Sequence, residues 1–191
     1  MASPYKATPR RPSILDRSLT KPRNDKVSLA AFSFLFCEMV QYTQKRVSDL
    51  GDLELQLNEF GYRMSHRILE LVVWRDKLGR PKDVLSCLIF INSHVWKALF
   101  GKPADSLEKS TEHENECMLF DADMISDNDP LVGRFVSIPK EMSFFSCGAF
   151  VGGIVQGILD ASGFPCKVTA HSTATAEFPT RTTLLMKFEH S

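Results

Sequence analysis

Residues 144–171 read FFSCGAFVGGIVQGILDASGFPCKVTAH, and this stretch decides the fold. Apolar side chains recur in it at helical spacing, while the glycines at positions 148, 152, 153 and 157 gather toward another face. Because each glycine weakens a helix by roughly 1 kcal/mol, packing and not local propensity has to hold this helix together. The pattern therefore predicts a central buried helix whose bare glycine face lies flat against a sheet or another helix.

The sequence also indicates where this helix begins and ends. Ser146 is a plausible N-cap, Gly163 can take a left-handed turn, and Pro165 cannot continue the helix. Residues 167–171 then alternate between apolar and polar side chains, which is typical of a strand. Residues 181–188 predict a final strand, which we expect to pair antiparallel with 167–171 across a polar loop.

Three further helices are predicted upstream, at residues 28–45, from 49 or 51 to 74, and at 83–100. The first is apolar almost all the way round, so it has to be covered on more than one side. The second has the cleanest amphipathic pattern in the chain. Gly61 lies inside this second helix and indicates a close crossing or a kink.

The segments between these helices carry weaker signals. Residues 104–116 are acidic and polar and predict an exposed connection, and residues 117–120 predict a short strand. Residues 121–129 read as a turn-rich loop, and 133–138 as another strand. Together these elements predict an α+β fold, with about four main helices packed on one face of a small twisted antiparallel sheet.

Charge divides the chain into an arm and a domain. The whole chain is neutral, with 23 basic and 23 acidic residues, so no global field points to a nucleic-acid partner. Residues 1–26 hold seven basic residues against two acidic ones, a local net charge of +5, and four prolines. They predict a basic flexible arm before a single domain at 27–191. The arm is either a solvated tail or a contact for an anionic membrane or an acidic partner surface, through Arg10, Arg11, Arg17, Lys21 and Arg23.

No catalytic, metal-binding or cofactor-binding motif is present in the sequence. The histidines show no HxxxH spacing, no cysteine pair has CxxC spacing, and phosphate-binding glycine motifs are lacking. Five widely spaced cysteines indicate reduced thiols in cytosol, and the apolar run at residues 29–40 is too short to span a bilayer. Two alternatives stay open: Cys147 as a nucleophile near a helix start, and His66 and His94 as haem ligands.

Six stretches of the chain resemble a known family. They are ILDRSLTKPR (14–23), VSLAAFSFLFCEMVQ (27–41), VWKALFGKPADSLE (95–108), SIPKE (137–141), GIVQGILDASGFPCKVTAH (153–171) and TTLLMKFE (182–189). With them the chain resembles the small core subunits of TRAPP, the transport protein particle that tethers vesicles, and within that family it is most like the subunit-five group. The resemblance implies an α/β domain related to ligand-binding domains of nitric-oxide signalling and Golgi transport.

The resemblance also implies a function. TRAPP small subunits join into a rod that, once assembled, promotes nucleotide exchange on a Rab-type GTPase in ER-to-Golgi transport. It implies a non-catalytic scaffold subunit, cytoplasmic and peripheral at cis-Golgi or ER–Golgi membranes. Its partners would be a central acylated paralogue, bound through the first two helices, and a longin-like subunit elsewhere. The predicted interface residues are Phe32, Phe36, Met39, Leu53, Leu57, Phe60 and Met64.

One departure from the family pattern concerns acylation. In the central paralogue an acylated cysteine follows a Gly-Arg pair before the third helix, whereas here Gly79 and Arg80 are followed by Pro81. We therefore do not expect this chain to be acylated. The alternative function is a binding module that holds an apolar small molecule, a lipid or haem, in a helix-lined pocket.

Overall fold

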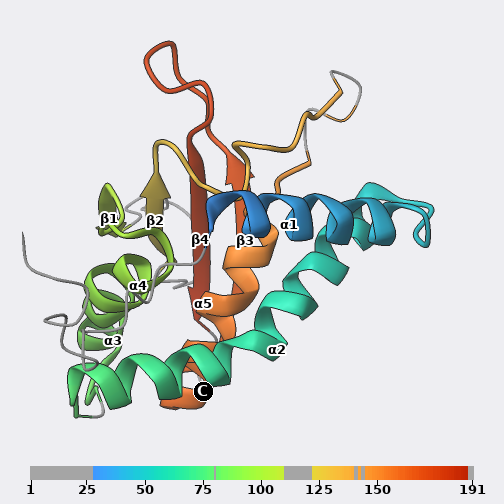
Figure 1. The fold of residues 1–191 in the computed structure, drawn as a ribbon. Helices are drawn as coiled ribbons and strands as arrows, with labels where there is room; N and C mark the ends of the chain where they lie inside the picture. The colour runs from blue at the N-terminus through green and yellow to red at the C-terminus, as the bar shows by residue number, and fades with distance from the viewer. Residues whose placement is uncertain (1–27, 80, 110–121, 140–141, 143–144, 189–191) are drawn as a thin grey trace, which may run out of the picture.

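The computed structural model describes residues 28–79, 81–109, 122–139, 142 and 145–188 of the chain. Its elements follow the order α1 (Leu29–Gln44), α2 (Leu50–Asp76), α3 (Val84–Phe90), η2 (Ile91–Val95), α4 (Trp96–Phe100), β1 (Ser106–Lys109), β2 (Ala122–Asp127), α5 (Ala149–Ser162), β3 (Cys166–Ser172) and β4 (Thr182–Phe188) (Figure 1). The predicted arm at residues 1–26 and the strand predicted at 117–120 lie outside the described residues.

The sheet has four antiparallel strands in the order β1-β2-β4-β3. Its inner face is apolar and buried: Val168 lies opposite Met186, and Ile125 lies opposite Leu184. The helices α1, α2 and α5 lie together on one side of the strands in Figure 1. The predicted α+β class is therefore confirmed, including the antiparallel pairing of the last two strands.

Helix α5 is the centre of the fold, as its sequence predicted. It lies between the sheet and α2, and eleven of its fourteen residues are buried. A Cβ added at Gly153 would lie 1.9 Å from the carbonyl oxygen of Asn58, and one added at Gly61 would lie 1.9 Å from that of Phe150. The backbones of α2 and α5 are therefore in direct contact, which no residue larger than glycine permits. The predicted close crossing at Gly61 is confirmed.

The two ends of α5 differ in how well they were predicted. Gly163 takes the expected left-handed conformation with φ of 91°. Gly148, not Ser146, occupies the N-cap position, so that prediction is wrong. The Ser146 hydroxyl accepts the backbone N–H of Gly148 at 3.2 Å, in the turn that precedes the helix. The backbone N–H of Ser146 donates to the Glu54 carboxylate at 2.8 Å.

The predicted third helix is continuous but contains a π-helical turn. Asp83 caps its start by accepting the N–H of Ser86 at 3.1 Å, and Gly101 ends it in a left-handed conformation. Between these ends, α3, η2 and α4 follow one another without a break. Apolar periodicity does not distinguish one π turn from the surrounding α-helix, so η2 was not predicted.

Three predictions for the connecting segments are wrong. The expected connection at 104–116 contains β1, and the expected loop at 121–129 contains β2. Both strands contain charged residues, and the pairing of β1 with β2 and of β2 with β4 outweighs their low strand propensity. Residues 133–138, expected as a strand, form turns in which the Val136 N–H donates to the Gly133 carbonyl at 3.4 Å.

Candidate interaction surface

Helix α1 has a buried side and an exposed side, and both are apolar. On the buried side the ring of Phe36 meets that of Phe150 edge-on, with centroids 5.5 Å apart. On the exposed side Phe34 keeps 78% and Leu35 73% of their accessible surface. Adjacent large apolar side chains with this exposure are one signature of a surface that binds a partner.

A loop extends this exposed face beyond α1. The Cys37 thiol donates to the carbonyl oxygen of Phe135 at 3.4 Å. Because Cys37 lies one helical turn after Phe34, the backbone of Phe135 lies close to α1, and Phe135 is itself 43% exposed. We call the set Phe34, Leu35 and Phe135 the α1 surface.

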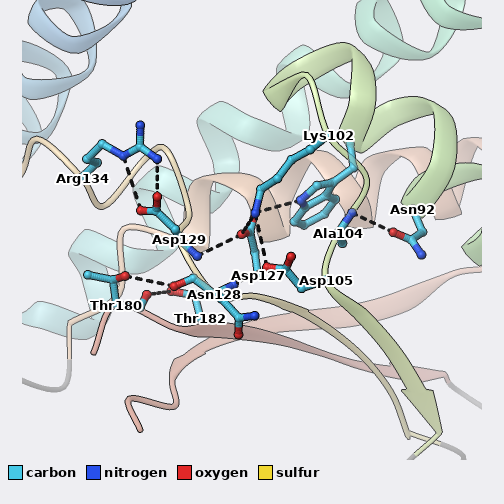
Figure 2. Close-up of polar contacts among 11 residues, drawn as sticks. Asn92, Lys102, Ala104, Asp105, Asp127, Asn128, Asp129, Arg134, Thr180 and Thr182 are labelled. Atoms are coloured by element: carbon cyan, nitrogen blue, oxygen red, sulfur yellow. Dashed lines mark hydrogen bonds and ion pairs between the residues drawn. The ribbon is translucent and has the colours of Figure 1, made fainter. Parts of the chain in front are cut away.

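A buried aspartate ties the neighbouring elements together (Figure 2). Asp127, at the end of β2, is 2% exposed. Its carboxylate accepts the indole N–H of Trp96 at 3.0 Å and the ammonium of Lys102 at 2.9 Å. Buried charges are stabilised when they are paired and hydrogen-bonded in this way. Asp127 therefore links β2 to α4 and to the turn that follows α4.

Neighbouring charges complete this network. The backbone N–H of Asn128 donates to Asp105 at 2.7 Å and, with Lys102, lowers the pKa of that carboxyl. Desolvation lowers the pKa of Lys102, but hydrogen bonds and charges from Asp127 and Asp105 outweigh it, so the net pKa is raised. Both groups stay ionised at neutral pH, and the network remains charged there.

The same network positions the loop that carries Phe135. The backbone N–H of Asp129 donates to the buried Asp127 carboxylate at 3.1 Å, and the Asp129 side chain binds Arg134 (Figure 2). Arg134 directly precedes Phe135. Hydrogen bonds thus run from the core, through the loop, to the α1 surface. Their role is positional, since none of these groups is arranged for catalysis.

The structure places the predicted interface residues mostly on the inner sides of α1 and α2. Phe36, Leu53 and Leu57 are buried in the core of this chain, and Leu57 is 0% exposed, so these three positions are corrected. Phe32, Met39 and Phe60 are partly buried against the core, while Met64 is exposed. Contact of these last four side chains with a partner stays a prediction.

The residues of the α1 surface were not among those that the sequence predicted for the interface. A helix that is apolar all round does not reveal which side faces the core. Phe34 and Leu35 belong to the apolar run of the first helix but were not assigned to the interface. In α2, the residues assigned to the interface were those that recur every three or four positions, and this spacing also marks the side of a helix that faces the core. Phe135 lay in a segment predicted as a strand. The basic contact residues Arg10, Arg11, Arg17, Lys21 and Arg23 lie outside the described residues, and their role stays a prediction.

The cysteine hypothesis is contradicted by burial. Cys147 is buried, and burial raises the pKa of its thiol to about 12. A thiol with this pKa stays protonated at neutral pH, and no reagent or substrate reaches it. Burial also raises the pKa of Cys166 to about 12 and that of Cys87 in the same direction. Cys147 is therefore a core residue and not a nucleophile.

The two histidines named as haem ligands have other contacts. The His94 Nδ1 lies 2.8 Å from an Asp76 carboxylate oxygen, and its ring stacks on Phe90. His66 is exposed on α2 with its ring against Tyr62. In the part of the chain that the structure describes, no three His, Cys, Asp or Glu side chains gather as a metal site. No described helix has the length and hydropathy needed to cross a bilayer.

A cleft of about 720 Å³ opens between α1, α2, α4 and α5. Its walls are mainly apolar, and the side chains of Phe32, Ile68, Leu99 and Phe150 contribute to them. Arg75 and Lys97 also line it. The cleft is distinct from the α1 surface, which lies on the outer side of the same helix.

Comparison with known proteins gives a consistent result. Residues 32–189 match the family described as transport protein particle (TRAPP) component. The chain is 46% identical to trafficking protein particle complex subunit 5 of Dictyostelium discoideum, with 92% of each chain covered. It is 39% identical to the Homo sapiens subunit 5, covering 94% of this chain and 89% of that protein. A relative in Saccharomyces cerevisiae, subunit 31, is 27% identical over 87% of this chain and 77% of its own.

A solved structure shares the fold. It is a trafficking protein particle complex subunit 3 from Naegleria fowleri covalently bound to palmitic acid. The superposition has a TM-score of 0.67 and covers 85% of this chain and 95% of that one. With 13% sequence identity, the match bears on the fold alone.

Proposed function

This chain belongs to the transport protein particle (TRAPP) component family, and we propose that it is a non-catalytic scaffold subunit of a TRAPP vesicle-trafficking complex. The family resemblance noted in its sequence is confirmed by relatives that are named as subunits of a trafficking complex. Other TRAPP subunits are therefore its partners. The proposed scaffold role rests on the α1 surface.

The observation that carries the proposal is the exposure of Phe34 and Leu35. Removing such side chains from water stabilises an interface by about 2 kcal/mol each. Phe and other large apolar residues are also enriched at the centres of protein interfaces. The resemblance implied a paralogous subunit bound through the first two helices. We therefore assign the outer side of α1 to that subunit.

The finer functional statements follow from the family. In this proposal the assembled complex, and not this chain alone, promotes nucleotide exchange on a Rab-type GTPase in ER-to-Golgi transport. The chain holds neighbouring subunits in place, in cytoplasm and peripherally at cis-Golgi or ER–Golgi membranes. The basic arm contributes a salt-sensitive membrane contact.

The test is co-expression with the subunit 3 paralogue, using Phe34→Glu and Leu35→Glu. Either change places an unpaired charge in the apolar interface, so we expect co-purification to be lost while the lone chain keeps its fold. Trp74→Glu is the comparison variant, because Trp74 is equally exposed but lies near the C-terminal end of α2, so it tests whether the loss of binding is confined to α1. Unchanged binding by both α1 variants would contradict the assignment.

The apolar cleft favours a second candidate function, which is non-covalent binding of a fatty acid. The structural neighbour is a subunit bound to palmitic acid, and the cleft here has Phe32, Ile68 and Lys97 in its lining. Pro81 follows Gly79 and Arg80, so a covalent link at that position is not available. Native mass spectrometry with added palmitic acid tests this candidate. Binding that Ile68→Trp removes would support it, and the absence of any bound lipid would contradict it.

A further inference from the structure

Strand β3 lies at the edge of the sheet. In the order β1-β2-β4-β3 it pairs with β4 on one side, and no described strand pairs with its other side. Successive backbone groups of an antiparallel strand point alternately to the two sides. Every second N–H and C=O of β3 therefore faces away from the sheet.

Two hydrogen bonds identify which residues face outward. The Thr173 N–H donates to the Arg181 carbonyl at 2.9 Å and continues the pairing with β4, so residues 171, 169 and 167 also point to β4. The Val168 N–H instead donates to the Gln156 side chain at 3.3 Å, away from β4. Both observations place Ala170 and Ser172 outward. Among the described residues, the outward N–H groups of these two have no acceptor.

A groove of about 620 Å³ runs along this edge. Residues 166–171 of β3 form one side, and the first turns of α2 form the other, with Glu54, Leu55 and Asn58. A strand of seven residues spans roughly 23 Å, enough for an extended peptide to lie beside it. The groove therefore offers backbone hydrogen-bonding groups and room for one more strand.

The wall opposite β3 has a definite charge. Glu54 of α2, whose carboxylate accepts the backbone N–H of Ser146 at 2.8 Å, lines the groove on this side. Asp160 of α5 adds another carboxylate to the groove lining, and exposed Leu55 adds an apolar contact. Lys167 and His171 lie on the strand side. A segment that fits this groove has an extended backbone, a basic side chain toward α2, and an apolar side chain over Leu55.

We propose that the free edge of β3 binds an extended basic segment of a neighbouring TRAPP subunit, which adds to the sheet as a fifth strand. This inference rests on the proposed function, because the segment comes from another subunit of the complex. It assigns a second contact surface to the chain, separate from the α1 surface. Unpaired strand edges are natural templates for such pairing, and main-chain hydrogen bonds supply the affinity.

Ala170→Pro tests this proposal directly. Proline at position 170 removes an outward N–H that lies within the groove lining and leaves the β4 pairing intact, because this N–H points away from β4. Ala170→Ser is the matched control, since it keeps the N–H. Thermal unfolding and circular dichroism of the lone variants establish that both fold like the unmodified chain.

The measurement is hydrogen–deuterium exchange of peptides covering residues 166–172, in the lone chain and in the assembled complex. We expect these amides to exchange at least about tenfold more slowly in the complex, and Ala170→Pro to weaken binding of the covering subunit by about tenfold. Ala170→Ser is expected to bind normally. Slower exchange of the α1 amides in the same complex tests the proposed function separately, because that function assigns the α1 surface to a partner subunit.

Three results would overturn the inference. The first is equal exchange of residues 166–172 in the lone chain and the complex while the α1 surface is protected. The second is protection already present in the lone chain and lost when residues 1–26 are deleted, which assigns the groove to the chain's own basic arm. The third is protection that rises with the concentration of the lone chain, which assigns it to a second copy.

Discussion

At the scale of single residues, the contact between α2 and α5 depends on positions where only a hydrogen atom fits. A Cβ at Gly153 would meet the backbone of Asn58, which cannot move without displacing α2. A Cβ at Gly152, the preceding residue, would lie 3.5 Å from a methyl group of Val168, an ordinary contact. Two adjacent glycines of one helix therefore have different roles.

We predict that Gly153→Ala destabilises the chain by about 3 kcal/mol or more, because overpacking against backbone cannot relax. Gly152→Ala is the control. It should leave the free energy of unfolding unchanged or raise it by up to about 1 kcal/mol through helix propensity. Urea denaturation measures both. Equal stability of the two variants would show that the helices do not meet at Gly153.

The buried thiol of Cys147 gives a prediction for alkaline pH. Its pKa of about 12 in the folded chain lies above the ordinary value of about 9. Above pH 9 the unfolded chain loses this proton while the folded chain keeps it, so deprotonation favours unfolding. The contribution of this group is constant below pH 9 and then falls by up to about 1.4 kcal/mol per pH unit toward pH 12.

The measurement is urea denaturation between pH 8 and pH 10.5 for the unmodified chain and for Cys147→Ala. Other groups also titrate in this range, so the comparison of the two slopes isolates Cys147. We expect the free energy of unfolding of Cys147→Ala to fall less steeply with pH. Parallel slopes would mean that the thiol is not buried in solution.

At the scale of elements, Asp127 joins β2, α4 and the loop beneath the α1 surface. We predict that Asp127→Ala lowers the free energy of unfolding by about 3 kcal/mol, because Trp96 and Lys102 lose their buried acceptor. Asp129→Ala removes only an exposed ion pair with Arg134 and should cost less than about 1 kcal/mol. Urea denaturation of both variants checks this. Equal losses would show that Asp127 is no more important than a surface charge.

The sequence predicted the elements with strong periodic patterns. Helices α2 and α5 and strand β3 were predicted because their apolar residues recur at one period. The apolar content of α1 and of residues 83–100 predicted helices there, and residues 181–188 predicted the strand β4. Strands β1 and β2 were missed because each is short and carries charged residues, and their strand conformation depends on the pairing of β1 with β2 and of β2 with β4. The turns at 133–138 were mistaken for a strand because Phe135 and Val136 have high strand propensity.

The candidate site was less predictable than the fold. The apolar character of α1 indicated an interface, but the side facing the partner depends on how α1 packs against Phe150. Phe36 was assigned to the partner and lies in the core, while Phe34 was passed over and is exposed. The groove along β3 depends on strand order and on the acidic turns of α2. The packing of α1 against Phe150 and the groove between β3 and α2 each bring together segments that are far apart in the chain, so local sequence patterns do not predict them.

At the scale of the whole molecule, the fold is a layer of helices on one side of a four-stranded sheet, with α5 at the centre. The arrangement gives a contiguous apolar core and still leaves apolar side chains of α1 exposed. We propose that another TRAPP subunit covers this α1 surface. In this proposal the chain functions within a complex of TRAPP subunits and not alone.

Size-exclusion chromatography with light scattering tests this claim most directly, on the chain alone and co-expressed with the subunit 3 paralogue. We expect the lone chain to self-associate through the α1 surface and the pair to elute as a sharp species of one copy each. A lone chain that stays monomeric and does not bind the paralogue would contradict it.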